Sequence, residues 1–266
     1  MKRKLKKNHT SKSHSGINPT IILFCCAIGT FYISSWFAYK GALSFVYAAL
    51  LNVVAIYAMY TVMHDAAHRI AHRTKWLNNL LGRVCAFHEG ITFPLFRLSH
   101  MQHHRYTNDP QRDPDYVIGR KPRWLFPIWV IVRLLHDNTF MISQKLWRRR
   151  ELIEHLFTVA LQVVTALLLA SMLGWSTVIG LWLIPLIVAG ALVEMTVAWL
   201  VHFPHESTDE LEHTRLLKSR VLQVLMLNHN LHLVHHVWPG IPWYQYGNKL
   251  DELDVLLAQK TKQNTI

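Results

Sequence analysis

Long apolar runs alternate with polar segments along the 266 residues of this chain. A helix needs roughly 20 apolar residues to cross about 30 Å of hydrocarbon. Four runs approach that length, at residues 21–39, 43–63, 156–173 and 178–201. We therefore predict an all-α membrane protein in which four transmembrane helices form two hairpins.

Two shorter apolar stretches, residues 84–98 and 124–135, lie between the second and third runs. They are too short or too interrupted to cross a bilayer, and Arg97 and Arg133 add polar faces, so we predict interfacial or re-entrant helices. The Lys/Arg/Ser-rich beginning predicts a basic disordered tail over residues 1–20. The membrane domain is predicted to cover residues 21–250, followed by a C-terminal tail over residues 251–266.

Positive charge predicts the orientation of these helices. The chain has 28 Lys and Arg residues, and 27 of them fall on one side if all four runs cross, with Lys40 as the exception. Because cytosolic loops carry the excess of Lys and Arg, both termini and the long central loop are predicted to be cytosolic, as in a bacterial inner-membrane protein. The net charge of +12 is then explained by membrane topology, and we expect no nucleic-acid partner.

Composition agrees with a membrane protein and points to one unusual residue type. Charged residues make up 17% of the chain, against about a quarter in soluble domains. The three cysteines form no C-x-x-C pair, which excludes zinc-ribbon, iron–sulfur and thioredoxin motifs. Histidine, with 18 copies, is the residue that suggests chemistry.

Eight histidines form three clusters on the predicted cytosolic side, next to the membrane. The clusters are His64 and His68; His100, His103 and His104; and His232, His235 and His236. Spacings of three and four residues place such side chains on one face of a helix. Imidazole suits iron, zinc, copper and nickel, and eight ligands exceed the shell of one ion. We predict a centre of two adjacent metal ions, with a large cytosolic helical cap carrying the ligands.

In this order and spacing, the clusters resemble the histidine boxes of the membrane fatty-acid desaturase/hydroxylase superfamily, H-x(3–4)-H followed by two H-x(2–3)-H-H boxes. The resemblance covers roughly residues 61–246. It implies that the eight histidines bind two iron ions in a di-iron centre that activates O₂. It also implies one more histidine at the cytosolic end of the last span, where we expect His202, with His205 as the alternative.

Two acidic residues are candidate catalytic groups. Asp65 lies inside the first box, where a carboxylate can accept a hydrogen bond from a metal-bound imidazole. Glu194 lies within the fourth run, eight residues before His202, and an ionisable group at membrane depth is a functional candidate. We expect Glu194 to face the substrate channel, with a structural polar pair as the alternative. The Asp-Pro pairs at 109–110 and 113–114 either support the histidines or simply form turns.

Strings around the boxes narrow the resemblance. Phe93-Pro94, the Asn-Asp-Pro at 108–110, Trp238-Pro239 and the Ile-Pro-Trp-Tyr at 241–244 resemble bacterial-type β-carotene 3-hydroxylases within the superfamily. This implies O₂-dependent hydroxylation of a carotenoid ring, with a fatty acyl-lipid desaturase as the alternative. In either case we expect a lipophilic substrate that enters from the bilayer.

The chain has no haem-binding segment, flavin fingerprint or cysteine cluster, so we expect an external electron donor, ferredoxin-like or cytochrome-like. A divalent-metal transporter or another metal-binding membrane protein is the hypothesis from a different class. Transport predicts ionisable ligands along the spans. Here Glu194 is the one acidic residue within a run, while the clustered histidines lie at one face.

Overall fold

The computed structural model describes residues 16–120 and 126–264, and within these ranges it contains helices and no strands. Four segments of the described chain are long and apolar enough to cross a membrane. They are α1 (Pro19–Tyr39), α2 (Phe45–Ala67), α6 (Arg149–Leu173) and the continuous helical segment Trp175–Leu200. The prediction of an all-α membrane protein is confirmed, and each predicted run lies within or almost within one of these segments. Residues 1–15 of the predicted tail lie outside the described residues.

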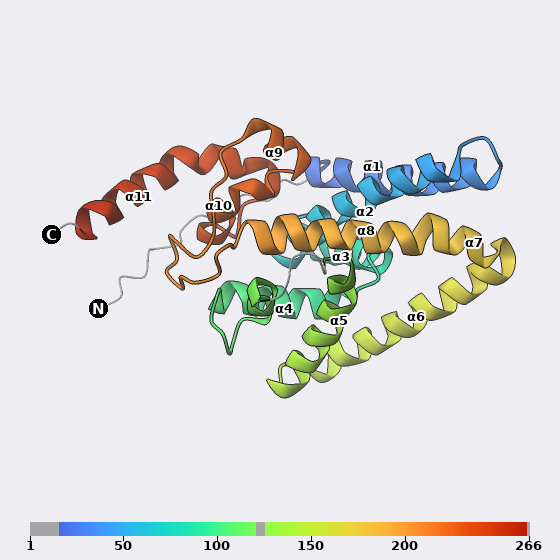
Figure 1. Ribbon diagram of the computed structural model, residues 1–266, viewed down its shortest axis with the longest axis horizontal. Helices are drawn as coiled ribbons and strands as arrows, with labels where there is room; N and C mark the ends of the chain where they lie inside the picture. Colours follow the sequence, from blue (N-terminus) through green and yellow to red (C-terminus); the bar gives the residue numbers. More distant parts are fainter. Residues whose placement is uncertain (1–15, 121–125, 265–266) are drawn as a thin grey trace.

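The fourth segment is assembled from four consecutive helical pieces. They are α7 (Trp175–Val178), η3 (Ile179–Leu183), α8 (Ile184–Val193) and η4 (Glu194–Leu200). Two of these pieces, η3 and η4, are π-helical. Pro185 stands at the start of α8, where its missing N–H interrupts the regular hydrogen-bond ladder. Gly174, with φ of 84°, separates α6 from α7, and the chain reverses direction between these two helices (Figure 1).

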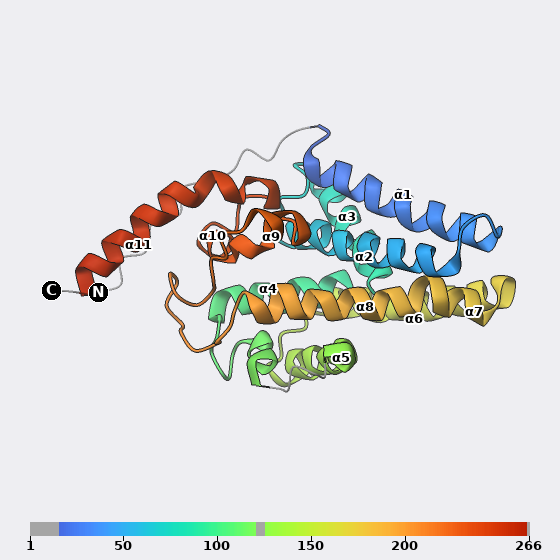
Figure 2. The same ribbon diagram turned by 45° about the horizontal axis from the view of Figure 1, so that its top comes forward.

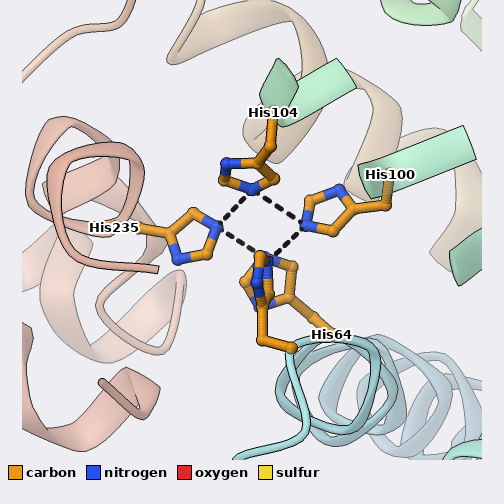
Figure 3. A group of neighbouring side chains, drawn as sticks. His64, His100, His104 and His235 are labelled. Atoms are coloured by element: carbon orange, nitrogen blue, oxygen red, sulfur yellow. Dashed lines mark hydrogen bonds between the residues drawn. The ribbon is translucent and has the colours of Figure 1, made fainter. Parts of the chain in front are cut away.

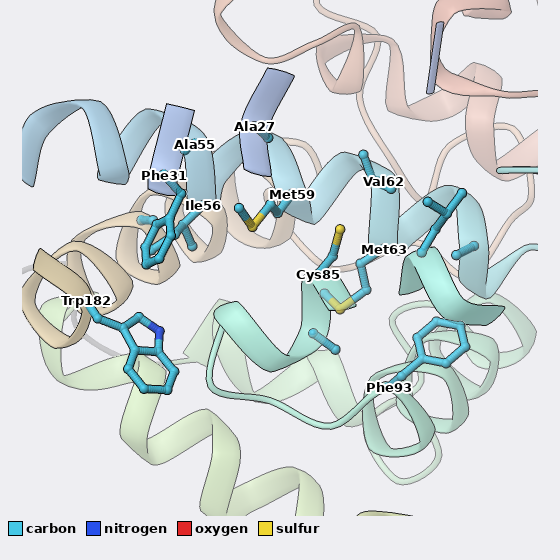
Figure 4. Close-up of a cluster of buried hydrophobic side chains, with 14 of the residues drawn as sticks. Ala27, Phe31, Ala55, Ile56, Met59, Val62, Met63, Cys85, Phe93 and Trp182 are labelled. Atoms are coloured by element: carbon cyan, nitrogen blue, oxygen red, sulfur yellow. The ribbon is translucent and has the colours of Figure 1, made fainter. Parts of the chain in front are cut away.

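The main apolar core joins both pairs of long helices. Figure 1 and Figure 2 show α1 beside α2, and α2 beside α8. Figure 4 shows the side chains between them, among which Met59 and Met63 of α2 and Trp182 of η3 are buried. By contrast, α6 exposes many large apolar side chains, such as Phe157 and Leu168. Such a surface is stable against lipid and would be unstable in water.

Two further helices cross beneath this core, at the first of the short apolar stretches. They are α3 (Lys75–His88) and α4 (Phe93–Tyr106). Gly90 separates them with φ of 66°, and a Cβ atom there would lie 2.7 Å from Leu186. Thr92 caps α4 by accepting from the N–H of Leu95. The turn between α3 and α4 therefore brings α4 against α2 and α6.

Most of the remaining elements gather where α2 and η4 end, away from the α1–α2 and α6–α7 turns (Figure 1). They are η1 (Pro114–Arg120), α9 (Arg220–Leu225), η5 (His229–Leu231), α10 (His232–Val237), η6 (Trp243–Lys249) and α11 (Leu250–Asn264). Helix α5 (Phe126–Ser143) instead packs along α8. Of the second short apolar stretch, residues 124 and 125 lie outside the described ranges. The predicted C-terminal tail is mostly helical, and its Leu253 is buried against the cluster around Tyr246.

Candidate metal centre

One group of histidines surrounds a common point between α2, α4 and α10. It comprises His64, His68, His100, His104 and His235, whose ligand atoms lie within 4.8 Å of one another. Figure 3 shows the rings of His64, His100, His104 and His235 turned toward each other. The Nε2 atoms form a chain of close approaches: His68 to His100 at 2.9 Å, His100 to His104 at 3.1 Å, His104 to His235 at 2.8 Å and His235 to His64 at 3.1 Å.

A second group lies directly beside the first. It comprises His103, His202, His232 and His236, again with ligand atoms within 4.8 Å of one another. All four are buried. The Nε2 atoms of His232 and His236 are 3.2 Å apart. Together, the two groups contain all nine histidines that the sequence analysis selected as metal ligands.

Each of the two H-x-x-H-H boxes supplies two histidines to one group and one histidine to the other, and the two boxes do so in opposite ways. On α4, His100 and His104 enter the first group while His103 enters the second. On α10, His232 and His236 enter the second group while His235 enters the first. The reason is helical geometry, because residues four apart share a face and the residue between them is rotated away. Each box therefore links the two groups.

The spacing of the nitrogen atoms fits a metal ion better than a hydrogen-bond network. Metal–imidazole bonds are roughly 2.1 Å long, so ligands at right angles around one ion lie roughly 3.0 Å apart. The first group has four Nε2–Nε2 distances between 2.8 and 3.1 Å. In the second group, the buried Nε2 atom of His103 forms no hydrogen bond with any described residue. A metal ion would satisfy that atom.

Electrostatics keep most of these imidazoles neutral, which is the form that binds metal. Burial and the nearby positive charge of Arg97 lower the pKa of His68 to about 3. Burial and neighbouring imidazoles lower the pKa of His100, His104 and His235 well below its usual range. The exception is His103. Burial alone would lower its pKa, but the carboxylates of Asp113 and Asp115 outweigh burial and raise it.

Several non-ligating atoms of the histidines have a protein partner. Nδ1 of His103 donates to Oδ1 of Asp113 at 2.9 Å, and Asp113 in turn accepts from the backbone N–H of Asn108 at 2.7 Å. Nδ1 of His235 lies 3.0 Å from the hydroxyl oxygen of Tyr246. Such partners orient a ligating imidazole and fix its tautomer. The Asp-Pro pair at 113–114 thus supports a histidine, whereas Asp109 pairs with Arg112 at the surface.

The two acidic candidates, Asp65 and Glu194, have different surroundings. Asp65 turns away from the histidines: Oδ2 accepts from the hydroxyl of Thr20 at 2.9 Å, and Oδ1 accepts from the backbone N–H of Trp243 at 3.4 Å. It links α1 to the C-terminal segment. Glu194 lies 3.8 Å from Arg133 and lines a cavity that reaches His100.

That cavity runs from the first histidine group into the apolar part of the molecule. Its apolar wall comes from α2, α5 and α8, with Met63, Leu134 and Ala189 among its residues. Its polar end is held together by Arg133, which forms ion pairs with Asp115 and with Asp137. The cavity thus joins an apolar lining to the polar groups beside His100.

Three other histidines near the centre have different roles. His205 lies outside both groups; its ring centroid is 5.9 Å from that of His202. His229 is fully buried, and its Nε2 lies 3.2 Å from the hydroxyl of Thr61. It lies next to the first group without belonging to it. His213 packs against His236, with ring centroids 4.8 Å apart. Sequence spacing gave no signal for His213 or Tyr246, because both reach the centre only through the fold.

The chain is similar in sequence to known proteins over most of its length. The family model described as fatty acid desaturase matches residues 34–260. Dihydrorhizobitoxine desaturase of Bradyrhizobium elkanii is 28% identical over 84% of this chain and 69% of its own length. An sn-1 acyl-lipid omega-3 desaturase (ferredoxin) of Nostoc is 25% identical over 80% of this chain and 66% of its own length. Beta-carotene 4-ketolase 3 of Haematococcus lacustris is 25% identical, over 74% and 62% respectively. The chain thus spans about two thirds of the length of these relatives.

Proposed function

Because the chain belongs to the fatty acid desaturase family, we propose that it is an O₂-dependent membrane oxidoreductase with a di-iron centre that acts on C–H bonds of a lipophilic substrate. The observation that carries this proposal is the pair of adjacent histidine groups, which gather nine imidazoles at one end of four apolar helices. Few carboxylates and no thiolates belong to the described groups, and such imidazole-rich sites suit iron rather than magnesium or calcium.

In this proposal each histidine group holds one iron ion, and the two irons supply the capacity to bind and activate O₂. The protein keeps the ligand nitrogens neutral and correctly turned. Asp113 holds the Nδ1 proton of His103, and Tyr246 contacts Nδ1 of His235. The second group is buried, as are His64, His100 and His235 of the first group, and this burial limits the access of bulk water to the reacting atoms.

The cavity beside His100 is the proposed place of the substrate. Its lining from α2, α5 and α8 is mostly apolar, and these elements include two of the four candidate spans. An apolar chain or ring can therefore enter from the bilayer without crossing water. Glu194 and Arg133 close the polar end of the cavity next to the histidines.

Two reactions fit this site. Desaturation is supported by the relatives named as desaturases; it removes two hydrogens from the substrate and, with two electrons and two protons, reduces O₂ to two waters. Hydroxylation of a carotenoid ring is supported by the strings around the boxes and by the relative named as a carotene ketolase. In hydroxylation one oxygen atom enters the product and the other leaves as water.

Both reactions need two electrons from outside. A ferredoxin-like donor is supported by the Nostoc relative, which is named as a ferredoxin desaturase, and a cytochrome-like donor is the alternative. The positive-inside rule supports placing both termini and the histidines on the cytosolic side of a bacterial inner membrane.

The test is a lipid profile of a bacterial host that accumulates β-carotene, with and without this protein, beside a His103→Ala control. New unsaturated acyl chains that are absent from the control would establish desaturation. New carotenoids heavier by one or two oxygens would establish ring hydroxylation. If purified protein bound no iron, the di-iron proposal would be wrong whatever the profile.

A further inference from the structure

A cleft with a strong excess of positive charge lies beside the first histidine group. It is formed by α3, α4 and the beginning of α6. Its basic lining residues in the described chain are Arg69, Lys75, Arg83, Arg97, Arg148 and Arg150, against the acidic Glu151 and Glu154. Of these basic side chains, Arg83 is the one with a described ion pair, to Glu154 at 2.7 Å. We call this surface the basic cleft.

The basic cleft and the substrate cavity lie on opposite faces of α4. Residues 93, 94, 97, 98 and 101 line the cleft, whereas residues 96, 99 and 100 line the cavity. At 100° per residue these two sets point in roughly opposite directions. A partner in the cleft would therefore leave the cavity free for substrate.

The positive charges of the cleft also lie close to the histidine ligands. Arg97 stands one turn before His100 on α4, and Arg69 directly follows His68 in the chain. Like charges are crowded here, since six basic residues line the cleft, and burial together with the charge of Arg69 lowers the pKa of Arg97. Crowded cations at a surface attract a partner with several negative charges.

We propose that the basic cleft docks an acidic one-electron carrier protein, which passes electrons across α4 to the first histidine group. This inference rests on the proposed function, because the carrier supplies the two electrons that the reaction needs. Each encounter oxidises one carrier by one electron. Two encounters therefore supply the two electrons which, together with two protons and the two hydrogens removed from the substrate, reduce O₂ to two waters in desaturation. Substrate and carrier then approach α4 from different sides.

An acidic protein matches the cleft better than a lipid phosphate. Six basic residues face two acidic ones, and one phosphodiester headgroup carries a single negative charge. The cleft also has apolar walls, from Phe93, Pro94 and Met101. A surface that combines apolar area with arginine is typical of protein interfaces.

The chain supplies a matched pair of variants for the test. Arg149 and Arg150 are neighbours at the start of α6, and both are exposed. Arg150 lines the cleft and Arg149 does not. The variants Arg150→Glu and Arg149→Glu therefore make the same change in net charge on the same helical turn, but only one of them changes the cleft.

The measurement is the Kd of an acidic [2Fe–2S] ferredoxin for the full-length, iron-loaded protein in nanodiscs of zwitterionic lipid. We expect binding that weakens with added salt, a Kd raised about tenfold or more by Arg150→Glu, and a much smaller change from Arg149→Glu. Equal effects of the two variants, or no saturable binding, would overturn the proposal. If Arg150→Glu left ferredoxin binding unchanged but reduced retention of phosphatidylglycerol, the cleft would belong to a lipid headgroup instead.

This test separates the docking proposal from the proposed function. Binding is measured without turnover, so docking can stand even if the host profile shows no product. Conversely, turnover driven by a small chemical reductant, combined with unchanged ferredoxin binding in Arg150→Glu, would retain the oxidoreductase and reject the cleft as its docking surface.

Discussion

The rings of His104 and His236 stack with centroids 4.2 Å apart and 26° between their planes, although each belongs to a different histidine group. Two metal ions held by these groups would therefore be close neighbours. Because these two rings are in contact, a substitution of His104 or of His236 would also disturb a ligand of the other group.

The ninth ligand can be assigned by counting iron. We expect His202→Ala to retain about one iron ion per chain instead of about two, because the second group keeps only three imidazoles. His205→Ala should retain about two, since His205 lies outside both groups. Elemental analysis of the purified variants measures both. The reverse pattern would make His205 the ligand.

Asp113 should control how tightly the second group holds its metal. Asp113→Asn weakens the bond that orients His103, and loss of such a partner lowers metal affinity by roughly 10–100-fold. Titration with a chelator measures the change. Asp109→Asn is the matched control, because Asp109 also precedes a proline but pairs with Arg112 at the surface. Equal iron retention by the two variants would contradict this role of Asp113.

Asp65 should stabilise the fold without taking part in the reaction. Thr20→Val removes the hydroxyl that donates to Asp65, and leaving a buried carboxylate short of a partner destabilises by about 1–3 kcal/mol. Thermal unfolding should show a lower Tm. Asp65→Asn should retain the turnover per bound iron. A loss of turnover in Asp65→Asn at full iron content would instead make Asp65 catalytic.

A large side chain introduced in the cavity wall should block the cavity without loss of metal. Ala198 of η4 lines the cavity, so Ala198→Phe is expected to lower kcat/KM by about tenfold or more while iron content stays at the wild-type value. Ala191→Phe on α8 adds the same ring outside the lining residues and should have little effect. Product formation and iron content, measured side by side, distinguish a blocked cavity from a damaged centre.

The parts that sequence predicted are those that depend on local pattern. The spans follow from run length, so their limits differ from the helices by a few residues, apart from the longer start of α6. The histidines follow from spacing along single helices, and the structure gathers all nine of them. Asp65 shows the limit of this reasoning, because its neighbour His64 enters the first group while Asp65 contacts Thr20 and Trp243.

The parts that sequence did not predict depend on distant segments meeting. Tyr246 contacts His235 only because η6 folds back beside α10. His213 lies in an irregular segment with no helical spacing to any ligand. The assignment of His103 to one group and His100 to the other required knowing which helix faces each side of α4. The basic cleft likewise combines residues from 69 to 154, which no local pattern connects.

The reciprocal arrangement of the boxes on α4 and α10 has a consequence for how the protein is made. Neither histidine group contains its full set until the ribosome has synthesised α10, since His235 and His236 come last. Any iron acquired at the assembled centre is therefore acquired after all four apolar helices have been translated. A molecule that stops short of α10 lacks ligands of both groups, so the binding of two metal ions distinguishes a chain that is complete through α10 from a truncated one.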